Sequence, residues 1–162
     1  MAFFLFSGDS AKAVNVSPLN FELNSNPGDK IDNFIKIYND TDSEISVKME
    51  VEDFAASGER GEVLLKSNDS ISTYSLHNWV SMNPEVFNLS PRSTQVVQFS
   101  IVVPENAEPG GHYASILASI SSAGVESTGV GVAQKVGSLL LLSVSGEIFE
   151  KMDIAEFSAT GQ

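Results

Sequence analysis

The residues that could support catalysis are few in this sequence and are not spaced for it. The chain has two His, His77 and His112, and no Cys, which excludes a thiol nucleophile and thiolate metal sites. It contains no Gly-x-Ser-x-Gly elbow, no His-Glu-x-x-His helix and no phosphate-binding glycine-rich loop. Glu52 and Asp53 are neighbours on a predicted strand and point to opposite faces, so they cannot form a paired-acid glycosidase site. We therefore expect a protein that is not an enzyme and has no catalytic residues.

Three carboxylates, Asp40, Asp42 and Glu44, lie close together in one predicted turn. Calcium takes about six to eight oxygen ligands, and an EF-hand loop needs Gly at its sixth position. Counted from Asp40, that position is Ile45, so an EF-hand is excluded. A looser Ca²⁺ site between loops and a plainly solvated turn both remain open. We predict no metal site and no cofactor.

Four residues in or beside a long polar segment, residues 55–78, have side chains that are typical of glycan contacts. An aromatic platform with amide and imidazole hydrogen bonds would be formed by Phe54, Tyr74, His77 and Asn78. The alternative is that Phe54 and Tyr74 pin the segment to the core.

A different binding mode is indicated by the apolar second half of the chain. Val130–Val136 and Leu139–Val144 are nearly continuous runs of small or apolar residues. If one of these strands lies at a sheet edge, it could accept a strand from another protein by β-augmentation. The residues predicted to do so are Val130, Val132, Leu139 and Leu140. The alternative is an ordinary core strand covered on both faces.

The elements that must position these residues are strands. Ile45–Val51 and Val97–Val103 place an apolar side chain at every second position, and no long run has helical spacing. Asn26–Asp29 is a turn between predicted strands at Val14–Leu23 and Ile31–Asn39. We predict an all-β immunoglobulin-like sandwich of about seven to nine strands in a Greek key, with residues 55–78 as a long loop insertion containing one helical or 3₁₀ turn.

Length and charge limit the partners. The chain has 162 residues and a formal net charge of −12, which disfavours nucleic acid and anionic membranes. No run approaches the ~20 apolar residues that span a bilayer. We interpret residues 1–13 as a signal-peptide remnant or disordered start, residues 14–157 as the sandwich, and residues 158–162 as a linker to a further region. Ala11-Lys12-Ala13 fits a signal-peptidase cleavage rule.

Several motifs together resemble a known family. The sequence is similar to the N-terminal immunoglobulin-like domain of the WxL-interacting-protein family of bacterial cell-surface proteins, over roughly Val14–Phe157. The resemblance implies an exported peptidoglycan-binding domain. The motifs that carry it are Asn26–Asp29, Val47–Phe54, Trp79–Val80, Phe87–Pro91, Val97–Pro104 and Pro109–Tyr113. The stretch from Leu89 to Pro104 also resembles pilus chaperones and other bacterial surface domains.

We therefore predict a non-catalytic, extracytoplasmic binding module at the bacterial cell surface that contacts peptidoglycan or a cell-wall protein. The alternatives are a pilus-chaperone-like or adhesin-type domain that binds a protein by strand addition, and a passive spacer. Four residues are given structural roles. Trp79 is predicted in the core of a central strand, Gly110 and Gly111 in a tight crossing between sheets, and Tyr113 in a tyrosine corner with its ring turned inward.

Overall fold

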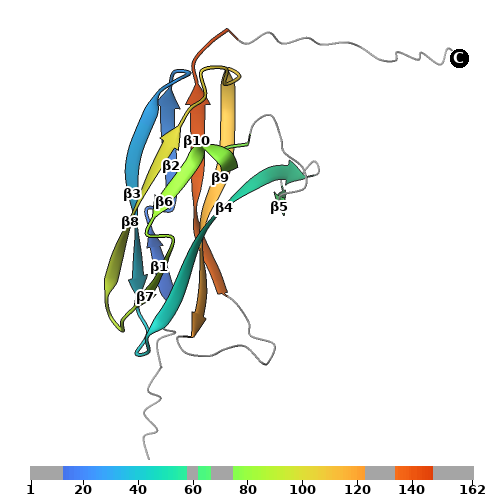
Figure 1. Ribbon diagram of the computed structural model, residues 1–162. Coiled ribbons are helices and arrows are strands. Elements are labelled where there is room, and N and C mark those ends of the chain that lie inside the picture. Colours follow the sequence, from blue (N-terminus) through green and yellow to red (C-terminus); the bar gives the residue numbers. More distant parts are fainter. Residues whose placement is uncertain (1–12, 58–61, 67–74, 123–133, 148–162) are drawn as a thin grey trace, which may run out of the picture.

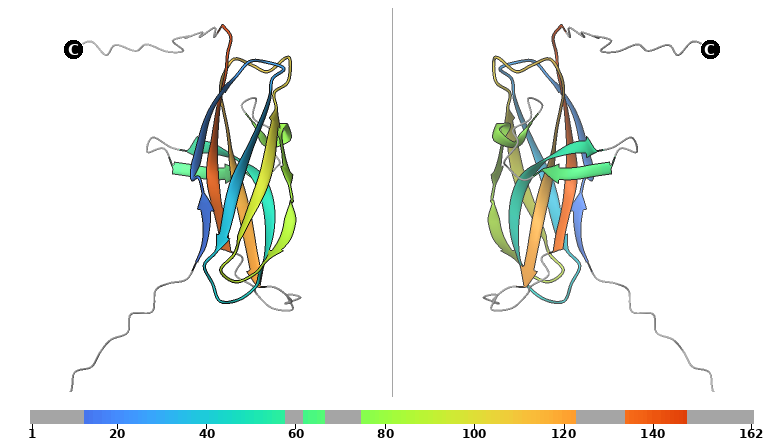
Figure 2. Two further views of the ribbon diagram at one scale, coloured as in Figure 1. Left: turned by 90° about the vertical axis from the view of Figure 1, so that its left-hand side faces the viewer. Right: turned by 90° about the vertical axis from the view of Figure 1, so that its right-hand side faces the viewer.

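Two β-sheets packed face to face make up the computed structural model, which describes residues 13–57, 62–66, 75–122 and 134–147 (Figures 1 and 2). One short 3₁₀ helix, η1, accompanies the strands in these residues. The elements are β1 (Val14–Ser17), β2 (Asn20–Ser25), β3 (Lys30–Asn39), β4 (Ile45–Ser57), β5 (Glu62–Lys66), η1 (His77–Trp79), β6 (Val80–Asn83), β7 (Val86–Leu89), β8 (Thr94–Val102), β9 (Gly110–Ser122) and β10 (Gln134–Val144).

The first sheet has the strand order β1-β3-β8-β6, and the second has the order β2-β10-β9-β4-β5, with β7 also paired to β4. All pairs are antiparallel except β2 with β10, which run parallel. This arrangement confirms the predicted all-β sandwich. None of the described residues forms a helix long and apolar enough to cross a membrane.

The period-two pattern explains which side chains fill the core. In β4 the buried side chains are Ile45, Val47, Met49 and Val51, and the intervening polar residues face outward. Phe99 in β8 and Phe21 in β2 meet edge to face across the two sheets, with ring centroids 5.0 Å apart. The apolar face that each strand presents is therefore what joins the layers.

The predicted strand Val14–Leu23 is divided in the structure. β1 ends at Ser17 and pairs with β3 in the first sheet, whereas β2 starts at Asn20 and pairs with β10 in the second sheet. Pro18 lies between them, and Pro cannot donate a hydrogen bond to a sheet ladder, so it is suited to the crossing point. Figure 2 shows β1 and β2 end to end along one side of the sandwich.

One other element differs from the sequence prediction. The predicted runs Val130–Val136 and Leu139–Val144 meet in one strand, β10, which starts at Gln134 in the described residues and passes Gly137 without a break. A side chain at position 137 would clash with Leu117, whose Cδ2 lies 2.4 Å from where a Cβ would be, so this position suits Gly. Residues 148–157 of the predicted sandwich lie outside the described residues.

Candidate functional site

β2 is the longest edge strand of the two described sheets. Leu139 N–H donates to Leu19 C=O and Ser145 N–H to Ser25 C=O, both at 2.9 Å. In a parallel pair the main-chain groups of alternate residues face the same neighbour, so those of Phe21, Leu23 and Ser25 point toward β10. The N–H and C=O groups of Asn20, Glu22 and Asn24 therefore point away from the sheet, where no described strand pairs with them.

The other free edges are shorter or are guarded. β1, β6 and β7 have four residues each and β5 has five, whereas β2 has six. Lys and Pro are common means by which proteins block edge pairing. Pro18 follows β1, Pro84 follows β6, and Lys135 lies on the part of β10 that extends beyond β2. Like β1, β6 and β7, β2 contains neither residue type, and its distinction among them is its length.

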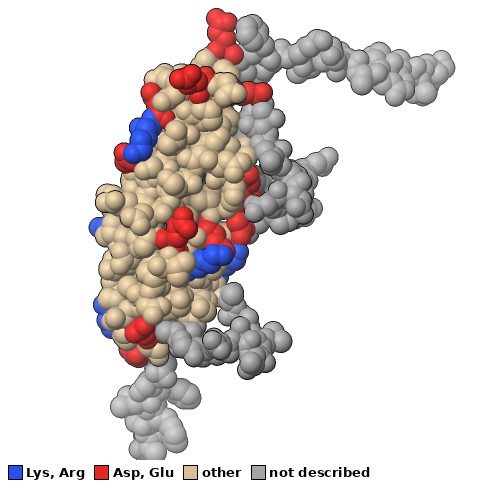
Figure 3. All heavy atoms as spheres, viewed as in Figure 1, with Lys and Arg blue, Asp and Glu red and all other residues tan. Residues whose placement is uncertain are grey.

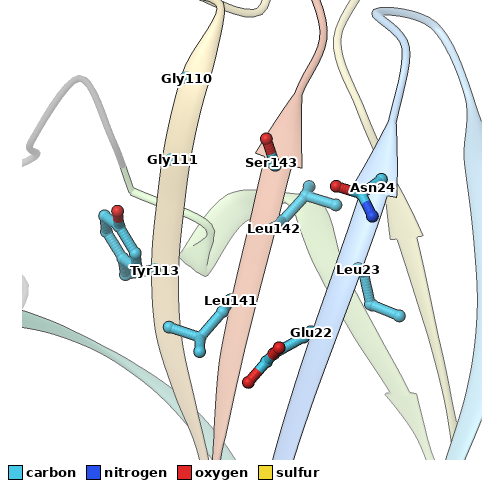
Figure 4. Close-up of a pocket in the computed structure, with 9 residues that line it drawn as sticks. All are labelled: Glu22, Leu23, Asn24, Gly110, Gly111, Tyr113, Leu141, Leu142 and Ser143. Atoms are coloured by element: carbon cyan, nitrogen blue, oxygen red, sulfur yellow. The ribbon is translucent and has the colours of Figure 1, made fainter.

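A hollow of ≈ 510 Å³ lies beside β2 on the outer face of the second sheet (Figure 4). Its walls are Tyr113 from β9, Leu141 and Ser143 from β10, and Glu22 and Asn24 from β2. The space exists because the β9 side contributes two glycines, Gly110 and Gly111, and because β4 pairs with β9 only as far as Ser115. In Figure 4 the Glu22 side chain extends from β2 toward β10.

Glu22 is an exposed carboxylate with no ion pair in the described part of the chain; its Oε1 accepts only a 3.4 Å hydrogen bond from Asn20 Nδ2. Glu50, on the same sheet, contrasts with it. Glu50 bonds Lys48 Nζ (2.8 Å), Ser119 Oγ (2.7 Å) and Lys135 Nζ (3.2 Å), which lower its pKa to about 2. Figure 3 shows large neutral areas between small charged groups on the face in view.

A second hollow of ≈ 570 Å³ lies on the outer face of the first sheet, between Phe34 and Val96. Its charged residues, Lys30 and Asp32, pair with each other at 3.0 Å. The β2 hollow is therefore distinguished by an acidic group that no described cation neutralises.

The four predicted glycan contacts are not brought to this hollow. His77 lies in η1, and its Nδ1 is 2.7 Å from Val51 C=O, which ties the ring to β4. Asn78 is exposed next to it. Phe54 lies in β4 and its side chain is not described, and Tyr74 lies outside the described residues.

Ser75, Asp53 and His77 lie close together where β4 leaves β9, but not in the order of a hydrolytic triad. The Asp53 carboxylate accepts from the Ser75 hydroxyl, and the His77 main-chain N–H donates to the same hydroxyl at 3.2 Å. In a triad the imidazole ring would accept the serine proton and the carboxylate would orient that ring. The three groups instead fasten η1 to β4.

The predicted strand-addition residues are placed differently from the expectation. Leu139 and Leu140 lie in β10 where β2 pairs on one side and β9 on the other, so they are inside the sheet. Their main-chain groups cannot accept another strand unless β2 leaves. Val130 and Val132 lie outside the described residues. The position beside β10 is filled by β2, which the sequence analysis did not separate from β1.

The predicted inward orientation of Tyr113 is wrong. Tyr113 is 42% exposed, its hydroxyl lies over Gly111, and the inward position belongs to His112, which is fully buried. Because strand side chains alternate, a shift of one residue exchanges the two faces. The His112 ring packs on Trp79 with centroids 4.5 Å apart, and its Nε2 is 2.8 Å from Glu108 C=O.

Trp79 and Gly110 also have identifiable roles. Trp79 ends η1 and packs half-buried against the core, at the start of the edge strand β6 and not within a central strand as predicted. Gly110 starts β9 with φ = +122°, a conformation that residues with a side chain rarely adopt.

The acidic turn is occupied by a cation from the chain itself. Arg92 pairs with both Asp40 and Asp42, and Asp42 Oδ1 lies 2.9 Å from the guanidinium. Hydrogen bonding to Asp42 raises the pKa of Arg92. No group of residues suited to hold a metal ion is present in the described parts of the chain.

Comparison with solved structures defines the class of fold. The chain is similar to a PapD-like domain of human CEP192 (TM-score 0.55, 9% identity, 91% of this chain and 96% of that one). It is similar to the periplasmic chaperone SfaE (TM-score 0.54, 11% identity, 85% and 61%). It also matches a chaperone–tip adhesion subunit pre-assembly complex of Acinetobacter baumannii Csu pili (TM-score 0.54, 10% identity, 83% and 58%).

These matches support an immunoglobulin-like sandwich fold, which the matched PapD-like domain and chaperones share. The chain spans about three fifths of the length of the two matched chaperone chains. No family model and no curated protein sequence matches it.

Proposed function

We propose that this domain is a non-catalytic, extracytoplasmic binding module that holds a protein partner by adding an extended segment to the free edge of β2. The observation that carries the proposal is the set of outward main-chain groups on Asn20, Glu22 and Asn24. An extended peptide can bond such groups and place alternate side chains on the two faces of the sheet. The likeness to periplasmic chaperones supports this reading and an extracytoplasmic location.

The side chains on both faces of the sheet at β2 are suited to an added strand. On the outer face a partner strand would lie beside Glu22, Asn24 and the hollow. On the inner face it would lie beside Leu23, which is only partly buried. Leu19, at the start of the edge, is 70% exposed and could cover an apolar side chain of the partner. A partner segment of about six residues would match β2 in length.

The test is a pair of double variants in the full chain. Asn20→Pro/Asn24→Pro removes two outward N–H donors, and Asn20→Ala/Asn24→Ala removes the same side chains but keeps the donors. Neither touches the N–H groups that bond β10, so both variants should fold. Extended seven-residue peptides selected on the wild-type protein should bind the Ala variant unchanged and the Pro variant at least tenfold more weakly. Equal binding by the Pro variant would contradict the proposal.

Peptidoglycan, which the sequence resemblance implies, is the second partner to test. Co-sedimentation with bacterial cell walls, intact and stripped of protein by protease, separates the two. A protein partner predicts that binding is lost on stripping and in the Pro variant. Binding that survives both would favour a direct glycan contact.

A further inference from the structure

The charge and shape around β2 indicate which partner segments it would select. This inference rests on the proposed strand addition and goes beyond it. We infer that the segment bound at β2 is amphipathic, with Lys or Arg on the face that lies beside Glu22 and apolar residues on the other face.

β2 is poorly suited to pair with β2 of a second copy of the chain. Only one antiparallel register uses all the outward groups: Asn20 opposite Asn24, and Glu22 opposite Glu22. In that register the two carboxylates belong to a hydrogen-bonded pair whose Cα atoms are about 5.5 Å apart, on the same face. Like charges directly opposite one another destabilise a strand pair. Pairing of β2 with its own sequence is therefore disfavoured, and an opposite charge facing Glu22 removes this repulsion.

Glu22 is available to a Lys or Arg side chain of a bound segment. It has no ion pair in the described part of the chain, unlike Glu50 and Glu52, which both bond Lys135. The chain carries a net charge of −12, so the field around this edge also attracts basic segments.

The position of the Glu22 carboxylate sets the length of side chain that can reach it from an added strand. The Glu22 side chain extends from β2 toward β10 (Figure 4), and neighbouring strands are about 4.8 Å apart. A Lys or Arg on the added strand must therefore cross β2 to reach the carboxylate, and its aliphatic stem is long enough to do so. Leu141 of β10 lies next to Glu22 on the same face and lines the same hollow.

The inner face demands the opposite chemistry. The β2 side chains on that face are Phe21, Leu23 and Ser25, and Leu23 is the one that the core does not fully cover. An apolar side chain opposite Leu23 would extend the core by one strand. A segment that alternates basic and apolar residues meets both requirements.

The inference is tested with three blocked seven-residue peptides that alternate Val with Lys, Thr or Glu, measured by calorimetry at low salt. The Lys peptide should bind about three- to tenfold more tightly than the Thr peptide, and the Glu peptide should bind most weakly. Glu22→Lys should reverse the order of the Lys and Glu peptides. Glu44→Lys makes the same change in net charge at an exposed turn outside β2, and it should leave the order unchanged.

The other outcomes separate the selection of basic segments from strand addition at β2. Equal affinities for the three peptides, or the same change from Glu44→Lys as from Glu22→Lys, would overturn the selection of basic segments. If the peptides bound without this selection but lost binding to Asn20→Pro/Asn24→Pro, strand addition at β2 would still be supported. Binding of the Lys peptide that is unaffected by the Pro variant would overturn both.

Discussion

At the residue scale, the buried side chain of Asn39 connects two separate parts of the chain by hydrogen bonds. It is fully buried, and its amide donates to the carbonyls of Ser43 (2.9 Å), Leu89 (3.1 Å) and Ser90 (3.1 Å). Its Oδ1 accepts from Thr41 N–H at 3.0 Å. One side chain thus joins the β3–β4 turn to the end of β7.

We expect Asn39→Ala to lower the free energy of unfolding by about 2–4 kcal/mol, because it removes the donor to the buried Leu89 carbonyl and to the partly buried Ser43 and Ser90 carbonyls. Asn15→Ala, at an exposed position on β1, is the control and should change stability by less than about 0.5 kcal/mol. Urea unfolding of the two variants measures this difference. Similar values for both would mean that water replaces the Asn39 amide.

Glu50 links stability to pH. Its pKa is lowered to about 2 by Lys48, Ser119 and Lys135, so its contribution to stability is fully present above the ordinary value of 4.5 and is lost as the pH falls toward 2. We expect wild type to lose on the order of 1 kcal/mol more than Glu50→Gln over this range, since solvent screens a partly exposed group. Parallel pH curves for the two proteins would contradict this.

Residue types predicted some of these contacts and not others. The sequence indicates that Asp40, Asp42 and Glu44 form a turn, but Arg92, fifty-two positions from Asp40, supplies the cation that occupies it. The sequence predicts the wrong face for Tyr113, because Pro109–Gly111 hides where the alternation of β9 begins. Asn39 looks like an ordinary turn residue until the carbonyls of Leu89 and Ser90, fifty and fifty-one positions away, converge on it.

At the element scale, the alternation of apolar residues was enough to predict the sandwich, because each half-buried strand carries its own period-two signal. What the pattern did not reveal is the sheet to which a strand belongs. The apolar positions change phase at Pro18, from Val14 and Val16 in β1 to Phe21 and Leu23 in β2, and the two strands pair with different sheets. The change of phase marks a break between the strands, but it does not show which sheet each strand joins, and the acceptor edge depends on that pairing.

Hydrogen exchange tests the alternation of main-chain groups along β2. The amides of Phe21, Leu23 and Ser25 face β10 and should exchange slowly. The amides of Asn20, Glu22 and Asn24 face outward and should exchange at least about tenfold faster, because no hydrogen bond must open first. Uniform protection along β2 would show that its outer edge is already covered.

At the scale of the whole molecule, an exposed edge of this kind invites self-association. A net charge of −12 and the opposition of Glu22 to itself both work against it. We expect the wild-type chain to sediment without pairing through β2, and Glu22→Val, which removes the repulsion and adds a residue favoured in strands, to self-associate more strongly. Glu44→Val, a matched change at an exposed turn, should not. Identical sedimentation of both variants would contradict this role of Glu22.

The central claim is that the free edge of β2 is where a partner strand adds. The most direct measurement is residue-resolved hydrogen exchange of the full chain with and without the alternating Lys–Val peptide. The account predicts that binding slows exchange at Asn20, Glu22 and Asn24, the residues that are unprotected in the free protein. Protection that appears on another strand, with these three amides unchanged, would contradict it.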